Sequence, residues 1–385
     1  MIRRKFRLTL KIFFVACIMA GCFRMHLSQR HVHRHERRKE RGLLTSDINS
    51  HDVTGQQINI SVEGLAPPSV VKTYGRILHA ENNKNVSEET KAQPNTTAQI
   101  NANESVSNDS LIVVNPHPYT FVLNHPDKCA GKEVFLVMIV TSSPNNHAQR
   151  YAIRHTWGST RIRNARDINI VTVFAVGKPD DVLTQRALEY ENKVHNDIIQ
   201  EDFVDSYTNL TLKTVMCLKW ASEFCPNAKF VMKADDDAFV NTYSLVRHLS
   251  SLHAANRSKL LTGHIFSGAL PIRDLKGKQK RWYLSKEDYP RETFPKYPCG
   301  FAYVMSSDVI RPLYEVSLTV KYLFLEDVFM GLCLEKLRIE PEHQGGFRIY
   351  KAPTTSCKSV KQLASHWFKT PEDMVNAWKV LNENC

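Results

Sequence analysis

The 385-residue sequence lacks the short motifs that assign several common activities. It has no G-x-S-x-G motif of serine hydrolases, no G-x-x-x-x-G-K-[ST] phosphate-binding loop and no H-E-x-x-H zinc motif. Its cysteines have no C-x-x-C spacing, which argues against a zinc ribbon. No internal repeat is visible, so the sequence disfavours an adhesion receptor built from tandem small domains.

The sequence also has little continuous hydrophobicity of the length that a membrane span needs. The uninterrupted apolar part near the N-terminus covers residues 12–23, whereas a span needs about 20 residues. Counting outward to residues 8–27, with Lys11 and Arg24 reaching the interface, predicts a transmembrane signal-anchor after a cytosolic tail of residues 1–7. A cleaved signal peptide is the alternative, but no A-x-A cleavage site is evident.

The positive charge is concentrated beside this segment. The net charge is +12 at pH 7, and basic residues crowd the first 41 positions on both sides of the apolar run. Such a distribution is typical of charged membrane flanks. We therefore expect a membrane partner and no nucleic-acid partner.

Glycosylation triplets place the rest of the chain outside the cytosol. One N-x-[ST] triplet is weak evidence, but several in one polar stretch predict a lumenal or extracellular location and a type II protein. The predicted glycosylation sites are Asn59, Asn85, Asn95, Asn103, Asn108, Asn209 and Asn256. The seven cysteines beyond the anchor should pair in an oxidising lumen, and their odd number leaves at least one free or bridging to another chain.

Composition changes once along the chain. Residues 28–115 are polar and show neither periodicity nor enough large apolar residues for a core, so we expect a disordered, glycosylated stem. Residues 116–385 are of a length that suits one large α/β domain.

The pattern of this domain alternates strands and helices. Residues 134–141 and 168–177 are continuously apolar, as in strands buried on both faces of a parallel sheet. Helical spacing over residues 210–224 follows a short strand around residue 200, and "KFVMKA" is the next strand. This predicts βαβ units with right-handed crossovers. Further along, we interpret "GHIFSG" and the aromatic-rich stretch around residues 281–310 as loops.

Three consecutive aspartates, Asp235, Asp236 and Asp237, follow the "KFVMKA" strand. Open α/β sheets bind ligands at the carboxyl ends of their strands. On an extended chain Asp235 and Asp237 point to one side and Asp236 to the other. Two convergent carboxylates suit a hard divalent cation shared with substrate phosphates. A solvated acidic turn, or a cap for the following helix, is the alternative.

A second acidic pair and a group of aromatic residues accompany the triplet. Glu326 and Asp327 stand where a helical pattern begins. They could stabilise the helix by interacting with its dipole, or one of them could be a catalytic base. Trp282 and Tyr283 could stack on sugar faces, although most aromatic residues only pack beneath loops.

The ordered motifs "RYAIRHTWG", "EDFVDSYTNLTLKT", "FVMKADDDAFVN", "FPKYPCGFAYVMS" and "EDVFMGLCL" closely resemble the Golgi β-1,3-galactosyltransferase/β-1,3-N-acetylglucosaminyltransferase family (glycosyltransferase family 31) over roughly residues 130–380. The resemblance implies a GT-A type nucleotide-sugar-binding fold with a mixed central sheet flanked by helices, and residues 116–385 as a lumenal catalytic domain. It implies a UDP-sugar donor, Mn²⁺, and inverting transfer to the 3-hydroxyl of an oligosaccharide acceptor on a glycoprotein or glycolipid at the Golgi membrane.

The same resemblance assigns roles to individual residues. It implies Asp327 as the catalytic base. The implied donor contacts are Arg150, Arg154, Asp235 and Asp236, the implied metal ligands are Asp235, Asp237 and His366, and the implied acceptor contacts are Trp282, Tyr283, Gly300 and Glu326.

Two departures from the family pattern bear on the substrate. Phe294 and Ala302 stand where relatives usually have Tyr and Gly, which puts the acceptor in question more than the chemistry. Glu326 before Asp327 matches the pattern of galactosyl rather than N-acetylglucosaminyl members, so the resemblance implies galactose as the transferred sugar. The alternatives are UDP-N-acetylglucosamine or UDP-N-acetylgalactosamine in the same fold, or a non-catalytic lumenal carbohydrate-binding protein.

Overall fold

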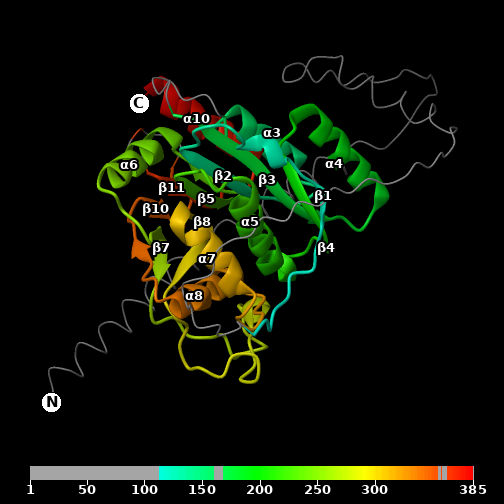
Figure 1. Cartoon of the computed structure of the whole chain (residues 1–385), viewed down its shortest axis with the longest axis vertical. Helices are drawn as coiled ribbons and strands as arrows, with labels where there is room; N and C mark the ends of the chain where they lie inside the picture. The colour runs from blue at the N-terminus through cyan, green and yellow to red at the C-terminus, as the bar shows by residue number, and fades with distance from the viewer. Residues whose placement is uncertain (1–111, 160–167, 354–356, 358–361, 385) are drawn as a thin grey trace, which may run out of the picture. The chain divides into compact units, whose positions relative to one another are not determined.

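The computed structural model describes residues 112–159, 168–353, 357 and 362–384 (Figure 1). The predicted tail, signal-anchor and nearly all of the predicted stem lie outside the described residues, as do the predicted sites Asn59, Asn85, Asn95, Asn103 and Asn108. None of the helices among the described residues has the length and apolar character required to cross a membrane.

An eight-stranded mixed sheet forms the centre of the domain, in the order β1-β4-β3-β2-β5-β8-β7-β9, and a second sheet has the order β10-β11-β6. The strands are β1 (Phe121–Leu123), β2 (Leu136–Thr141), β3 (Ile170–Lys178), β4 (Ile198–Val204), β5 (Phe230–Asp235), β6 (Phe239–Val240), β7 (Leu261–Phe266), β8 (Tyr297–Ser306), β9 (Glu342–His343), β10 (Phe347–Arg348) and β11 (Ala364–Ser365).

Helices connect and cover these strands. The α-helices are α3 (His147–His155), α4 (Val182–His195), α5 (Leu210–Phe224), α6 (Thr242–Ala254), α7 (Ser307–Ser317), α8 (Glu326–Leu337) and α10 (Pro371–Asn384). Short 3-10 turns are η2 (Pro126–Lys128), η3 (Tyr207–Asn209) and η4 (Lys280–Trp282). The predicted helix over residues 210–224 matches α5 in both bounds.

Strands β2, β3, β4 and β5 run parallel, which confirms the predicted βαβ half of the domain. Strand β8 pairs antiparallel with β5, and β7 pairs antiparallel with β8. The α/β class and the mixed sheet flanked by helices are therefore confirmed.

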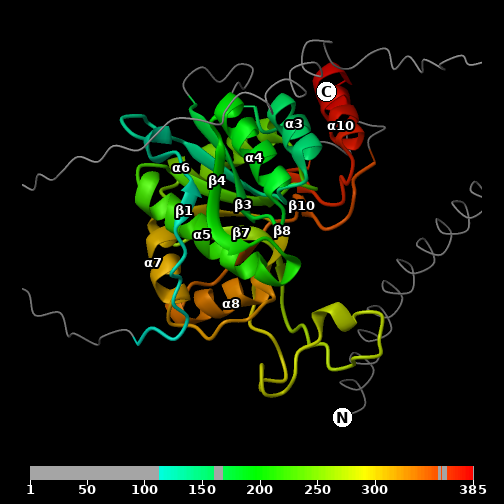
Figure 2. The same ribbon diagram turned by 90° about the vertical axis from the view of Figure 1, so that its right-hand side faces the viewer.

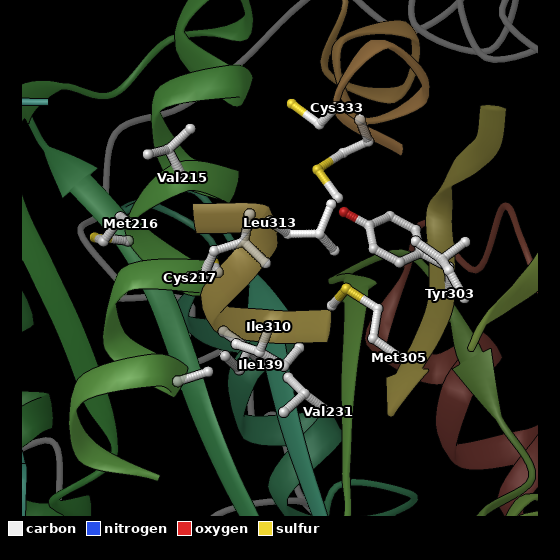
Figure 3. Close-up of a cluster of buried hydrophobic side chains, with 14 of the residues drawn as sticks. Ile139, Val215, Met216, Cys217, Val231, Tyr303, Met305, Ile310, Leu313 and Cys333 are labelled. Carbon is white, nitrogen blue, oxygen red and sulfur yellow. The ribbon is translucent and has the colours of Figure 1, made fainter. Parts of the chain in front are cut away.

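Two apolar clusters lie on the two faces of the sheet. Alternate residues of β2 enter opposite clusters, as expected for a strand that is buried on both sides. Helices α5, α7 and α8 cover one face, and α3, α4, α6 and α10 cover the other (Figures 1 and 2). Figure 3 shows Cys217 and Tyr303 inside the cluster that α5, α7 and α8 cover, where α5 and α7 meet the sheet.

The interpretation of two segments as loops is wrong in part, because residues 283–296 do form a loop but strands β7 and β8 take up much of the rest of these segments. "GHIFSG" begins within strand β7, and residues 297–306 form the ten-residue strand β8. Tyr303 is fully buried there, because β8 lies between β5 and β7 in the middle of the sheet. A proline and a glycine at the start of β8 concealed this strand, since such residues usually interrupt a ladder.

Disulfide pairing is partly observed. Cys129, beside η2, is bonded to Cys225 at the end of α5, and Cys357 is also disulfide-bonded. Among the described residues Cys217, Cys299 and Cys333 are free thiols. The loop closed by Cys129 and Cys225 contains β2, β3 and β4, and the bond joins the segment before β2 to the segment before β5, its neighbour in the sheet.

Candidate active site

The aspartate triplet lies at the carboxyl end of β5, beside the carboxyl end of β2. Thr141 and Asp235 are register partners, and the Thr141 hydroxyl donates to Asp235 Oδ1 at 2.8 Å. One ligand atom each from Asp235, Asp237 and His366 lie within 4.8 Å of one another. Carboxylate oxygens and an imidazole nitrogen form a donor set that suits Mn²⁺, so the residues present fit such a cation.

The C-terminal segment brings His366 to the triplet. Strand β11 pairs antiparallel with β6, which follows the triplet directly, and the Phe368 amide donates to the Asp237 carbonyl at 2.8 Å. The His366 ring stacks on Phe301, and its Nε2 lies 3.1 Å from Asp237 Oδ1. The triplet and this histidine are therefore joined by a backbone ladder and not by side chains alone.

Asp236 points toward the β2–α3 connection. Its Oδ2 accepts hydrogen bonds from the Ser142 hydroxyl at 2.7 Å and from the Asn146 amide at 2.8 Å. Burial raises the pKa of Asp236 above its ordinary value in spite of these donors. These contacts give Asp236 a structural task, and its predicted donor contact stays a prediction.

The two predicted donor-site arginines are engaged within the protein. Arg150 is fully buried, donates to Ser142 Oγ at 3.1 Å and pairs with Glu191 at 2.6 Å. Arg154 pairs with Glu191 at 2.7 Å and with Asp197 at 2.8 Å. Arg150 thus supports the loop that holds Asp236, and a direct contact of either arginine with a donor stays a prediction.

The second acidic pair begins α8, and its two members differ. Glu326 is 7% exposed, and its Oε1 accepts from the Thr214 hydroxyl at 3.0 Å and from the Tyr303 hydroxyl at 2.9 Å. Asp327 is half-buried, and its Oδ1 accepts from the Val328 amide at 2.9 Å. Burial, followed by the charge of Glu326, raises the pKa of Asp327 to about 7. A carboxylate with that pKa can accept a proton near neutral pH.

Lys233 joins the two acidic groups, and the sequence interpretation missed it. Its Nζ donates to Asp235 Oδ1 at 2.6 Å and to the Gly300 carbonyl at 2.5 Å, and lies 3.7 Å from Glu326 Oε2. The spacing of Lys233 and Asp235 on one strand contained the signal, because residues i and i+2 share a face. The contact with Glu326 depends on tertiary packing and could not be read locally.

Gly300 is a position of close approach. A Cβ at this position would lie 2.8 Å from Glu326 Oε2 and in ordinary contact, at 3.7 Å, with the Asp327 Cβ, so a larger residue would displace the Glu326 carboxylate. The predicted acceptor residues Gly300 and Glu326 are thus in mutual contact beside Asp327. The burial of Glu326 favours a supporting role, and its contact with an acceptor stays a prediction.

The predicted aromatic platform lies on a separate loop. Trp282 is 37% exposed, and its Nε1 donates to the Tyr207 hydroxyl at 2.7 Å. The Arg281 guanidinium lies 4.3 Å from the Tyr207 ring centroid and 5.2 Å from that of Trp282. Tyr283 forms an isolated parallel β-bridge, through its backbone, with Ile272. This surface is suited to a sugar face, and acceptor binding by Trp282 and Tyr283 stays a prediction.

Two predicted glycosylation sites fall within the described residues. Asn256 is exposed in the turn after α6 with a φ of 50°, a conformation that Asn tolerates. Asn209 is half-buried, its amide donates to the Val204 carbonyl at 2.9 Å, and Thr211 of the same triplet is buried. Asn256 is therefore the more accessible of the two predicted sites.

Comparison with known proteins matches this domain to one family. A model described as "Galactosyltransferase" matches residues 148–345, and a model described as "Beta-1,3-galactosyltransferase 2 N-terminus" matches residues 70–137. The chain is 39% identical over 265 residues to "Beta-1,3-galactosyltransferase 1" of Homo sapiens, covering 69% of this chain and 79% of that protein.

Two further similarities differ in strength. The chain is 40% identical over 267 residues to "Lactosylceramide 1,3-N-acetyl-beta-D-glucosaminyltransferase" of Homo sapiens, covering 68% of this chain and 69% of that protein. A solved glycosyltransferase "involved in the glycosylation of the major capsid of PBCV-1" aligns with a TM-score of 0.35 at 9% identity, covering 63% of this chain and 98% of that chain. That structural similarity is too remote to place any residue.

The matched family model spans the Asp235–Asp237 triplet and the Glu326–Asp327 pair, which are the two acidic groups joined by Lys233. The extent of this match and the identity to two full-length relatives together establish the relationship. The chain belongs to the galactosyltransferase family and is a hexosyltransferase.

Proposed function

We propose that the chain is an inverting, Mn²⁺-dependent β-1,3-glycosyltransferase that moves a hexose, with galactose as the first choice, from a UDP-sugar to the 3-hydroxyl of an acceptor sugar. The acceptor would be an oligosaccharide on a glycoprotein or glycolipid, and the enzyme would be a Golgi type II membrane protein. The observation that carries the proposal is the convergence of Asp235, Asp237 and His366 beside a separate half-buried acid, Asp327.

The two acidic groups would divide the reaction between them. Asp235, Asp237 and His366 would hold Mn²⁺, which when bound supplies positive charge to the departing diphosphate. Placement at the carboxyl ends of β2 and β5 is where sheets of this type bind nucleotides, and it supports a GT-A assignment.

Asp327 would act on the acceptor. Its carboxylate takes the proton of the acceptor 3-hydroxyl while that oxygen bonds to the anomeric carbon. The bond from the anomeric carbon to the UDP oxygen breaks, and its electron pair leaves with UDP. Attack from the face opposite UDP inverts an α-linked donor to a β product in one displacement.

The identity of the donor sugar separates two forms of this proposal. The chain is about equally identical to relatives named as galactosyl and N-acetylglucosaminyl enzymes, which supports testing more than one donor sugar. The purified full-length chain should be assayed with Mn²⁺, mixed acceptor sugars and, in turn, UDP-galactose, UDP-N-acetylglucosamine and UDP-N-acetylgalactosamine. We expect transfer with UDP-galactose to be fastest. A well-folded preparation that transfers no sugar from any donor would contradict the enzymatic proposal.

A further inference from the structure

Lys233 lies beneath both acidic groups and contacts three different elements. Its ammonium donates to Asp235 at the end of β5, donates to the carbonyl of Gly300 in β8, and lies 3.7 Å from Glu326 at the start of α8. Lys233 is 4% exposed. An ammonium group has three donors, so two of them are used by Asp235 and Gly300, and Glu326 lies within ion-pair distance of the same ammonium.

Each partner of Lys233 is itself held in place. Asp235 Oδ1 also accepts from the Thr141 hydroxyl, so both described hydrogen bonds to this carboxylate fall on Oδ1 and leave Oδ2 for a cation. The other oxygen of Glu326 accepts from Thr214 and Tyr303. The ammonium therefore sits between two carboxylates whose remaining contacts fix their orientation.

The residue that follows Glu326 is the proposed base. Because Asp327 is the next residue in α8, the anchoring of Glu326 also fixes where the Asp327 backbone begins the helix. The absence of a side chain at Gly300 permits this packing, since a Cβ would lie 2.8 Å from Glu326 Oε2.

We propose that Lys233 is a positioning residue that sets the cation-binding carboxylate Asp235 and the start of α8, and thereby Asp327, at a fixed separation. This inference rests on the proposed function, because it concerns the alignment of donor and acceptor in that reaction. Lys233 itself need not touch either substrate.

A half-buried lysine that also belongs to an ion pair offers a control. Lys219 of α5 pairs with Glu201 of β4 at 2.9 Å and also donates to the Tyr119 carbonyl at 2.8 Å. Its side chain is 15% exposed, and Glu201 pairs through β4 with the edge strand β1. Loss of Lys219 removes an ion pair between a half-buried lysine and a buried glutamate and leaves the acidic groups of the candidate site in place.

The kinetic test compares Lys233→Met with Lys219→Met in the full-length chain. Misplacement of catalytic groups by about 1 Å can cost about 100-fold in rate, so we expect kcat of Lys233→Met to fall by about 100-fold while KM for the UDP-sugar changes by less than about threefold. Lys219→Met should keep kcat within about twofold. Excess Mn²⁺ should not restore the Lys233→Met rate. An equal kcat for both variants, or full restoration by Mn²⁺, would overturn the proposal.

A second measurement does not depend on activity. The denaturant midpoints of Lys233→Met, Glu326→Gln and the double variant should be compared by urea unfolding. We expect the double variant to lose less than the sum of the two single losses, because it removes both charges of one pair. If Lys233→Met alone fails to fold, a double variant that folds again would also support the interaction between Lys233 and Glu326. Additive losses, or a double variant that recovers nothing, contradict the link between Lys233 and Glu326. If the wild-type chain transfers no sugar, the proposed function fails, whereas the midpoints still decide whether this link exists.

Discussion

The two acidic groups of the candidate site occupy different surroundings. Asp235 and Asp237 are half-buried at the end of β5 and lie close to the imidazole of His366. Glu326 is almost fully enclosed at a helix start by hydroxyl donors, and the pKa of its neighbour Asp327 is raised to about 7. Convergent ligands suit a cation, and a carboxylate with a raised pKa suits proton transfer. The comparison shows that the degree of burial and the neighbouring side chains decide which carboxylates can bind a cation and which can accept a proton.

The largest effect should come from removing the base. Asp327→Asn keeps the size of the side chain and removes its ability to take a proton, so we expect kcat to fall by about 10³-fold, within the range for general base catalysis. Initial rates of UDP release at saturating donor and acceptor measure this loss. An Asp327→Asn variant that keeps the full rate would remove the assignment of the base and leave the cation site standing.

The next effect should come from the other acidic group. Asp237→Ala removes a proposed ligand, so we expect activity and its dependence on Mn²⁺ to be lost together, with cation affinity reduced by more than about tenfold. Asp236→Asn is the control, because its carboxylate is already occupied by Ser142 and Asn146. Retention of both activity and Mn²⁺ dependence by Asp237→Ala would show that the cation binds elsewhere.

The pH dependence of kcat/KM should follow the ionisation of Asp327 and not that of Asp235 or Asp237. Because Asp327 must be ionised to accept a proton, kcat/KM should fall by about tenfold for each pH unit below about 7. Folding disfavours its ionised form, so its contribution to stability is present at low pH and is lost as the pH rises from 3.8 toward about 7. Asp327→Asn should flatten the change in urea midpoint over that window. An unchanged profile in the variant would assign the titration to another group.

The smallest effect should come from one hydroxyl around Glu326. Thr214→Val keeps the shape of the side chain and removes the donor 3.0 Å from Glu326 Oε1, so we expect a loss of about 1 kcal/mol in the free energy of unfolding. The rate should fall only a few-fold, because Tyr303 and Lys233 still contact Glu326. Urea unfolding and the initial rate measure the two effects, and a rate loss as large as that of Asp327→Asn would contradict this ranking.

The parallel half of the sheet could be predicted because its signals are local. Strands β2 and β3 are mostly apolar, β5 begins with an apolar run, and α5 shows clear helical spacing, so each element is specified within its own residues. Strand β8 could not be predicted in the same way. A proline and a glycine stand near its start, and its place between β5 and β7 makes it a strand.

The candidate site also contains some features that could be predicted from local sequence and others that depend on tertiary packing. The convergence of Asp235 and Asp237 could be predicted from their spacing on an extended chain, whereas in the structure Asp235 ends β5 and Asp237 lies in the turn that follows. The approach of His366 depends on the pairing of the two-residue strands β11 and β6, which are too short to leave a pattern. The contact between Lys233 and Glu326 joins residues 93 positions apart and required the packed structure.

Calorimetric titration of Mn²⁺ with UDP into the Asp237→Ala and Asp327→Asn variants tests most directly whether the two acidic groups divide the work. We predict that Asp327→Asn binds Mn²⁺ and UDP with nearly the affinity of the wild-type chain, whereas Asp237→Ala loses that binding. Loss of binding in both variants, or in Asp327→Asn alone, would contradict the separation of cation binding from proton transfer.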